Sequence, residues 1–488
     1  MKVALESVSQ ARQYIESKLS ERQVNKVLHS FPSPRFWRDK TATTRDARGP
    51  RPLDDDPTPP ASAAGEGAGG EHARTSELYV GLPFCLTTDP AHCGYCLFPT
   101  EDYRNVNQLD LYLDYLDKEG AVMADRWVDL SPSSIFIGGG TPNLLKRHQY
   151  PRMLGSIRRY IPKLKAGTPI TLEGIPQLFN REKLEILKGE GVTRISMGAQ
   201  QLDEDLSKLS GRSQKPKHVF QAVEWAAEFG MGCNVDLIFG WPQQTLENLR
   251  TDLQHLVDSG VEHITHYELN VGGATNFALK RRDELPSAER VREMYHAGRE
   301  LLTSQGYEQL TPYDFLKPEP GAGGSQFVYE ECRRHFAVHD AWGWGYAAIS
   351  DLPDARGESG WTFMNFRNLK QYYEALDAGR APTECAYRRS PKDMRLSLLF
   401  RNLQSLHVDR EGYRQRFGTD ALEEFAVIWE ALRDLDLVTI DEGGIHLTVE
   451  GSYRVPLIQT TLMQARVEEI IDGYLATQPQ PAGEGIPA

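Results

Sequence analysis

The strongest constraint on the fold is a regular alternation of short apolar runs and amphipathic stretches that begins at Glu77. Six β-prone runs occupy residues 77–82, 133–138, 169–174, 192–198, 233–240 and 263–269. The stretches between them place apolar residues near helical spacing and tend to end in glycine, as helices do. Because parallel strands need helical crossovers, this order predicts a partial (β/α)6 barrel of the TIM type, with its chemistry at the carboxyl ends of the strands.

The flanking sequence predicts further segments around this α/β unit, in keeping with roughly 150 residues per domain for a chain of 488 residues. Before the barrel we expect an N-terminal helical extension (1–38) and a disordered linker (39–76), the linker rich in Pro, Gly and Ala. The barrel with its connecting segment is expected over 77–381. Helical stretches and a β-prone pair over 382–476 predict a small winged-helix-like α+β domain, followed by a disordered tail (477–488).

Composition excludes several classes of protein. Lysine and arginine total 55 against 68 aspartate and glutamate, and the net charge of −13 disfavours a nucleic-acid partner. No apolar run approaches the roughly 20 residues that span a bilayer, and the first residues carry acidic side chains where a secretory signal is apolar. We therefore expect a cytoplasmic protein with no membrane partner. Six cysteines are too few for a disulfide scaffold in a chain of this length.

Three cysteines cluster directly after the first predicted strand: Cys85, Cys93 and Cys96 form C-x7-C-x2-C. Three thiolates can hold three irons of a [4Fe–4S] cluster and leave the fourth iron open to a ligand. The alternative is zinc bound with His92, although adjacent residues cannot easily face one tetrahedral ion and no second C-x2-C pair closes the site. The spacing favours the cluster. The other cysteines lack partner spacing and are interpreted as packing residues: Cys233, Cys332 and Cys385.

Several motifs follow one another at the predicted strand ends: YVGLPFC, CGYC, GGGTPN, ISMGAQ, LSGR and NVDLIFGWPQQT. In order and spacing this series resembles radical S-adenosylmethionine (SAM) enzymes, and most of all the oxygen-independent coproporphyrinogen III oxidase group. The match is strong over residues 77–275 and weaker beyond. The resemblance implies a [4Fe–4S] cluster whose open iron chelates SAM. One electron, from a donor such as flavodoxin or ferredoxin, then yields methionine and a 5′-deoxyadenosyl radical.

The resemblance also assigns roles residue by residue. Tyr79 matches a catalytic tyrosine that contacts the SAM sulfonium, and Tyr95 matches an aromatic residue that flanks the adenine. The turn near the methionine end of SAM is matched by Gly138, Gly139, Gly140 and Thr141. Polar residues that bind the amino group, carboxylate and ribose are matched by Glu173, Gln200, Arg212 and Asp236. Taken singly, these residues are ordinary turn glycines, ion pairs and a core tyrosine. Their joint placement at strand ends favours a cofactor site.

The sequence departs from the family at four places. The cysteine loop is four residues longer than the usual C-x3-C-x2-C, Gly81 replaces a histidine, Leu97 stands where some members have a fourth cysteine, and CRRHFAVHDAW matches only loosely. A longer surface loop costs little extra closure entropy, so cluster binding should survive. These changes argue against a porphyrinogen substrate more than against radical chemistry.

These departures lead us to expect a radical enzyme of natural-product biosynthesis that modifies a small unsaturated or aromatic metabolite. C-methylation or methylene transfer, such as cyclopropanation, would use a second SAM near Gly345 and Ile349 in the turn GWGYAAIS. The glycines and small residues of this turn are equally explained by packing. The alternatives are oxidative decarboxylation of coproporphyrinogen III and a non-catalytic haem-trafficking relative. A group of four basic residues could bind propionates or transfer a proton, although such a run is more usually a solvated surface patch: Arg333, Arg334, His335 and His339.

Overall fold

The computed structural model describes residues 5–23, 27–32, 75–273, 275–318, 339–354 and 356–476. Most of the predicted linker (39–76) and the whole predicted tail (477–488) therefore lie outside the described residues. Within them, one sheet of twelve strands dominates, in the order β14-β13-β12-β11-β1-β4-β5-β6-β7-β8-β10-β9. Its parallel part is formed by β11 (His339–Gly345), β1 (Thr75–Leu82), β4 (Ser134–Gly139), β5 (Ile170–Gly174), β6 (Arg194–Gln200), β7 (Gly232–Phe239) and β8 (His263–Glu268).

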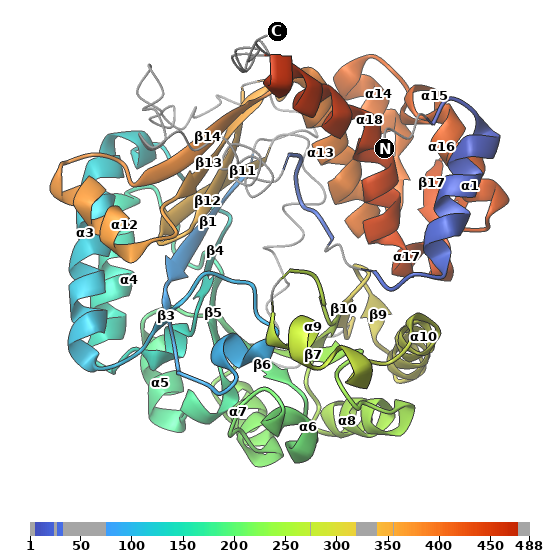
Figure 1. Ribbon diagram of the computed structural model, residues 1–488. Helices are drawn as coiled ribbons and strands as arrows, with labels where there is room; N and C mark the ends of the chain where they lie inside the picture. The colour runs from blue at the N-terminus through green and yellow to red at the C-terminus, as the bar shows by residue number, and fades with distance from the viewer. Residues whose placement is uncertain are drawn as a thin grey trace, which may run out of the picture.

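All six predicted strands are present, each with bounds within two residues of the expected ones. Six longer helices connect or follow them: α3 (Val106–Trp127), α4 (Gln149–Tyr160), α5 (Arg181–Gly189), α7 (Pro216–Glu228), α8 (Leu246–Asp258) and α10 (Ala288–Ser304). Figure 1 shows the strands curving in an arc with these helices along its outer side. Fully buried side chains such as Ile137, Leu172 and Val235 form the core between strands and helices. The predicted α/β fold with its partial barrel of parallel strands is confirmed.

The sheet is extended at both edges by strands that the sequence had left unassigned. Beyond β11 lie β12 (Ile349–Pro353), β13 (Gly360–Asn365) and β14 (Thr383–Arg389), which pair antiparallel. Beyond β8 lie β10 (Asp314–Leu316) and β9 (Glu308–Gln309). Strand β14 belongs to the large sheet, although we had expected the smaller domain to begin at residue 382. No pairing closes the sheet into a complete barrel within the part of the chain that the structure describes.

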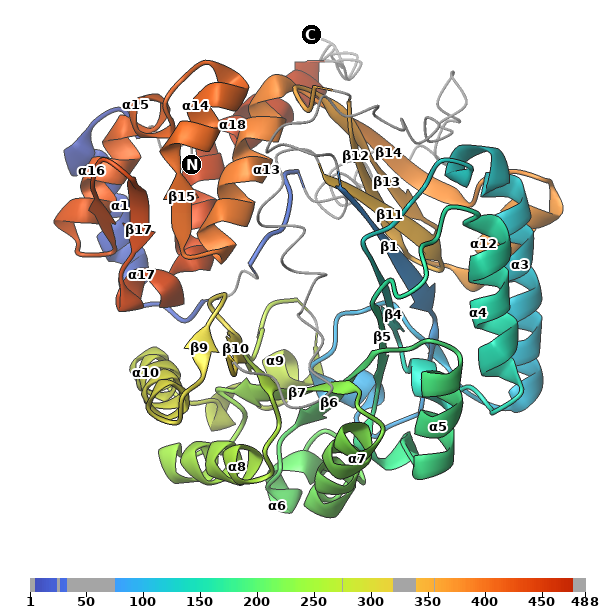
Figure 2. The same ribbon diagram turned by 180° about the vertical axis from the view of Figure 1, so that it is seen from behind.

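The smaller C-terminal unit is mainly helical and carries a three-stranded antiparallel sheet, β15-β17-β16. Its helices are α13 (Pro391–Gln404), α14 (Arg410–Phe417), α15 (Ala421–Glu424), α16 (Ala426–Asp434), α17 (Val449–Tyr453) and α18 (Val455–Ala476), and its strands are β15 (His407–Asp409), β16 (Val438–Ile440) and β17 (Gly444–Leu447). Helix α1 (Val8–Leu19) buries Ala11 and Ile15 in the apolar core of this unit, so an N-terminal helix packs with the C-terminal helices there (Figure 2).

Residues 20–23 and 27–32, called here the N-terminal segment, connect the two units. Arg22 donates to the carbonyl oxygen of Gly240 at 2.7 Å. Gln23 donates both to Glu268 at 3.1 Å and to the carbonyl of Tyr453 at 2.8 Å, which ties the sheet to the smaller unit. Ser397 of helix α13 accepts a hydrogen bond at its Oγ from the backbone N–H of Phe31, at 2.9 Å. These bonds fix the N-terminal segment between the two units.

Among the described residues, no helix combines the length and apolar character that a membrane crossing requires.

A buried carboxylate holds one edge of the sheet together. Glu119 of α3 accepts hydrogen bonds from the backbone N–H of Gly345 at 2.9 Å, from Asn365 Nδ2 at 2.7 Å and from the Tyr372 hydroxyl at 2.6 Å. Burial raises the pKa of Glu119 from 4.5 to about 7, although the three hydrogen bonds act in the opposite direction and lower it. The folded protein therefore keeps a proton on this carboxyl up to a higher pH than the unfolded chain does.

We predict that Glu119→Gln changes how stability depends on pH. In the wild type the ionised carboxyl is disfavoured on folding, so stability falls as the pH rises from 4.5 to about 7, by up to about 3 kcal/mol. Glutamine does not titrate, although it loses an acceptor and carries a pH-independent cost of about 1–3 kcal/mol. Urea unfolding at pH 5 and pH 8 should show the deficit of the variant shrinking at pH 8. The exposed Glu374→Gln on helix α12 (Leu369–Asp377) is the control, and an equal deficit at both pH values would contradict the prediction.

Candidate active site

The three clustered cysteines lie where β1 passes into β2 (Phe84–Cys85) and the short helix η2 (Ala91–Gly94). Burial raises the pKa of the Cys85 thiol to about 11, and the nearby Cys96 and Cys93 add to the rise, so the three sulfurs share one electrostatic environment. Thr141 Oγ1 donates to Cys85 Sγ at 3.4 Å. A coordinated metal deprotonates a thiol outright. The loop therefore suits thiols that become thiolates when a metal centre binds.

The longer cysteine loop forms part of the support for Cys93. His92 and Cys93 have φ values of 53° and 55°, a left-handed conformation that non-glycine residues adopt only when their surroundings enforce it. Thr88 supplies this support, since its Oγ1 accepts the backbone N–H of Cys93 at 2.9 Å and donates to the Pro90 carbonyl at 2.8 Å. A Cβ added at Gly211 would collide with the backbone of Asp89, so the loop packs closely on the LSGR motif.

The structure does not favour the zinc alternative. His92 is exposed, and its Nδ1 lies 3.0 Å from the Thr100 hydroxyl. In the described ranges, no three His, Cys, Asp or Glu side chains are arranged to hold a single metal ion. An iron–sulfur cluster places its thiolates on separate irons, so they need not converge on one point.

The glycine-rich turn after β4 packs directly beneath the cysteine strand. The backbone N–H of Gly140 donates to the Leu82 carbonyl at 2.7 Å, and that of Thr141 donates to the Phe84 carbonyl at 2.8 Å. Gly139 has φ +110°, and a Cβ built on Gly140 would stand 2.5 Å from the Phe84 carbonyl oxygen. The turn therefore needs glycine in order to hold β2 and Cys85 in place.

A cavity of about 520 Å³ opens beside the cysteines at the carboxyl ends of the strands. Five predicted residues line it: Tyr95, Cys96, Glu173, Gln200 and Asp236. The opposite side is lined by the N-terminal segment and helix α13, through Gln23, Val27, His29 and Gln404. The cavity is therefore enclosed by both units of the fold.

The cofactor side of this cavity is acidic. Burial and the neighbouring Asp236 raise the pKa of Glu173 to about 8, and Glu173 accepts the Gly139 N–H at 3.1 Å. Burial, with a contribution from Asp314, raises the pKa of Asp236 to about 7. Gln200 has a buried Oε1 with no hydrogen-bond partner among the described residues. Acceptors of this kind fit a ligand that carries an amino group and hydroxyl groups, as SAM does.

Two predicted residues are occupied by contacts within the protein. Arg212 donates to the Tyr95 hydroxyl at 3.2 Å, to the Gly198 carbonyl at 2.5 Å and to Gln214 at 3.1 Å. Tyr95 also packs on Trp241, with ring centroids 5.0 Å apart. In this arrangement Arg212 orients Tyr95 at the cavity wall. The ring of Tyr79 stacks on that of Phe136, with ring centroids 6.2 Å apart. The contact of Tyr79 with SAM stays a prediction.

The region predicted to support a second SAM does not line this cavity. Gly345 donates to Glu119, and Ile349 is 38% exposed at the start of β12. A second SAM site therefore stays a prediction. The same turn explains Gly81, because a Cβ there would lie 2.8 Å from the Tyr346 carbonyl oxygen. The histidine usual in the family has no room beside this turn.

Of the four residues in the predicted basic group, the structure describes only His339. This residue is buried, with Nδ1 at 2.8 Å from the Thr75 hydroxyl and Nε2 at 3.3 Å from Glu77, so it is not part of a solvated patch. Arg333, Arg334 and His335 lie outside the described residues, as does Cys332. Cys233 is buried in the core, as expected of a packing residue.

Comparison with known proteins agrees with this geometry. A family model described as the Radical SAM superfamily matches residues 84–256. The solved structure of the coproporphyrinogen III oxidase HemN from Escherichia coli, a radical SAM enzyme, superposes with a TM-score of 0.69 at 25% identity, covering 81% of this chain and 91% of that one. Residues 84–256 form a radical SAM domain, and the chain resembles the coproporphyrinogen III oxidase-like group. Its cofactors are accordingly a [4Fe–4S] cluster and SAM.

Two names recur among the curated relatives that this chain resembles. The oxygen-independent coproporphyrinogen III oxidase of Escherichia coli is 26% identical over 78% of this chain and 83% of its own length. The haem chaperone HemW of Bacillus subtilis is 26% identical over 76% of this chain and 95% of its own length. The expectation of a methyltransferase or methylene-transfer enzyme of natural-product biosynthesis is therefore wrong. The two alternatives we had placed behind it agree better with these relatives.

Sequence reasoning missed several residues that build the site. Thr88 supports the cysteine loop, and Gln23 and His29 line the cavity from a distant part of the chain. Thr88 carries no signal of its own, because its role depends on the loop conformation. Gln23 and His29 precede a long segment without sequence periodicity, so nothing in the sequence places them beside the barrel.

Proposed function

We propose that this protein catalyses the oxidative decarboxylation of coproporphyrinogen III, converting two propionate side chains into vinyl groups. The observation that carries the proposal is the extent of the structural match to the Escherichia coli oxidase, 91% of that chain. The radical SAM model covers only residues 84–256. The longer match therefore extends beyond the cofactor domain. Outside that domain, the smaller unit lines one side of the cavity.

Under this proposal the residues of the site have separate tasks. Cys85, Cys93 and Cys96 hold three irons, while Glu173, Gln200 and Asp236 bind the polar groups of SAM; the predicted contact of Tyr79 belongs to the same set. The bound cofactors supply a 5′-deoxyadenosyl radical. For each vinyl group, the substrate propionate loses one hydrogen atom to that radical, one electron to an acceptor and one carbon dioxide. The N-terminal segment and helix α13 screen the cavity from water.

Haem binding without catalysis is the second candidate. The Bacillus subtilis haem chaperone is matched over 95% of its length. His29 lines the cavity and offers an imidazole, a common ligand of haem iron. A protein of this kind would bind haem next to the cluster and turn over no porphyrinogen.

The experiment that separates the two uses anaerobically reconstituted full-length protein, a one-electron reductant, SAM and coproporphyrinogen III. We expect protoporphyrinogen IX, with two carbon dioxide molecules and 5′-deoxyadenosine, and no product when SAM is omitted. Product is measured by fluorescence after oxidation to protoporphyrin. Stoichiometric haem binding with a sharp Soret band, together with no decarboxylation, would decide for the chaperone.

A further inference from the structure

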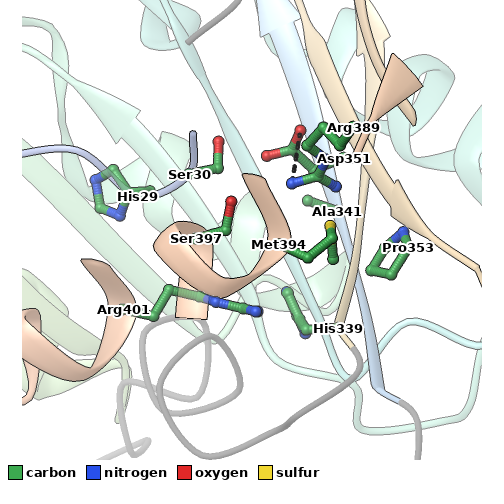
Figure 3. Close-up of a pocket in the computed structure, with 10 residues that line it drawn as sticks. All are labelled: His29, Ser30, His339, Ala341, Asp351, Pro353, Arg389, Met394, Ser397 and Arg401. Atoms are coloured by element: carbon green, nitrogen blue, oxygen red, sulfur yellow. Dashed lines mark ion pairs between the residues drawn. The ribbon is translucent and has the colours of Figure 1, made fainter. Parts of the chain in front are cut away.

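A second, smaller pocket of about 50 Å³ lies between helix α13, strands β11, β12 and β14, and the N-terminal segment. Figure 3 shows Arg389 beside Asp351 and Arg401 extending from α13 toward His339. A volume of this size accommodates a carboxylate group or a few water molecules, but not a pyrrole ring. Its wall carries two guanidinium groups and one carboxylate, which leaves a positive charge on the pocket.

Arg389 is the feature that calls for a ligand. Its side chain is only 3% exposed, and it forms an ion pair with Asp351, whose Oδ1 stands 3.8 Å from Nη1, beyond hydrogen-bond distance (Figure 3). Its Nε and Nη2 have no hydrogen-bond partner among the described residues. A buried guanidinium with unused donors is costly unless an acceptor meets it. A planar carboxylate accepts two such N–H groups at once.

The pocket adjoins the large cavity at His29, which lines both. Helix α13 presents Ser397, Arg401 and Gln404 at a spacing of four and three residues, which places them on one face of the helix. Ser397 and Arg401 line the small pocket, whereas Gln404 lines the large cavity. The N-terminal segment covers this face, since Gln404 donates to the Leu28 carbonyl and Ser397 accepts the Phe31 N–H. A short arm from a molecule in the large cavity would therefore reach Arg389 past the side chain of His29, which borders both spaces.

The geometry points to a carboxylate-binding chamber in which Arg389 and Arg401 bind one carboxylate arm of the substrate. This inference rests on the proposed function for the identity of that substrate, whose four propionates are arms of suitable length and charge. The large cavity itself is lined by the carboxyl groups of Glu173, Asp236 and Glu268. Because those groups repel an anion when ionised, a separate cationic chamber gives one propionate a place to bind and fixes the orientation of the ring.

The test measures binding of coproporphyrin III, a stable oxidised analogue with four carboxylates, and of its uncharged tetramethyl ester by fluorescence titration of the full-length protein. The wild type should bind the acid about tenfold more tightly than the ester. Arg389→Gln and Arg401→Gln should each remove most of that preference while affinity for the ester changes little. Arg389→Lys, which keeps the charge but not the planar fork, should retain part of it.

The matched control is Arg395→Gln, on the same helix, because Arg395 bonds to Glu424 and does not line the chamber. Thermal unfolding of each variant identifies loss of folding, and Arg401→Gln keeps the test open if Arg389→Gln does not fold. Equal binding of acid and ester by the wild type, or an unchanged preference in both variants, would overturn the inference. Absence of turnover with the acid preference intact would refute the proposed reaction but leave the chamber standing.

Discussion

Replacement of Cys85, Cys93 or Cys96 by alanine is expected to abolish cluster binding and SAM cleavage. The three thiols lie in one loop and each would bind one iron, so the loss of any one of them leaves the cluster without a full set of ligands. After anaerobic reconstitution the wild type should hold about four irons per chain. Each variant should lose this iron and form 5′-deoxyadenosine at less than about one hundredth of the wild-type rate.

Cys385→Ala is the matched control for these variants. Cys385 is a half-buried cysteine in strand β14, in register with Met364 of β13 and remote in sequence from the loop. It should keep both the iron content and the cleavage rate. Stoichiometric zinc without visible charge-transfer absorption in the wild type would contradict the assignment of a cluster.

The sequence predicted six of the seven parallel strands correctly, because each of these six is a short apolar run that an amphipathic helix follows. Ile137, Leu172 and Val235 are buried at the positions that this pattern gives them. The other strands of the large sheet were not predicted. Strand β11 reads HDAWGWG, and its tryptophans and glycines give no period-two alternation. Its place beside β1 depends on long-range pairing, which a local pattern does not contain.

The candidate site was predicted unevenly for the same reason. Residues at strand ends, such as Glu173 and Asp236, follow from the topology, because the carboxyl ends of parallel strands meet at one edge. Gly345 was assigned to a second cofactor by motif alone, whereas its N–H binds Glu119. His29 and Arg389 were not predicted, since they reach the cavities from segments that approach only in the folded chain.

Two of the departures from the family have local structural explanations. Gly81 is required by the approach of the Tyr346 carbonyl, and the longer loop provides Thr88 to hold Cys93. Neither change removes a group from the wall of the large cavity. Their original interpretation, as signs of a different substrate, therefore loses its force. We expect substrate selection to depend on α13 and the N-terminal segment, because both line the large cavity.

Gly140→Ala is expected to disrupt the cluster site without touching a cysteine. A Cβ at this position would stand 2.5 Å from the Phe84 carbonyl oxygen and 3.0 Å from the Pro83 carbonyl carbon, and both are backbone atoms that cannot rotate away. Strand β2 must shift, at a cost of about 1–3 kcal/mol, and Cys85 moves with it. We expect roughly a tenfold loss of 5′-deoxyadenosine formation, with iron content after reconstitution reduced in parallel.

Gly155→Ala is the matched control, because Gly155 lies inside helix α4 and an added Cβ meets nothing within 4 Å. There alanine should raise helix stability by about 0.5–1 kcal/mol and leave the cluster intact. The two variants add the same methyl group, so a difference between them isolates the contact with β2. Normal iron content and cleavage in Gly140→Ala would mean that the turn does not position Cys85. Loss of the cluster in Gly140→Ala but not in Gly155→Ala would show that the glycine turn helps to hold the cluster site, because that turn packs against β2 and Cys85.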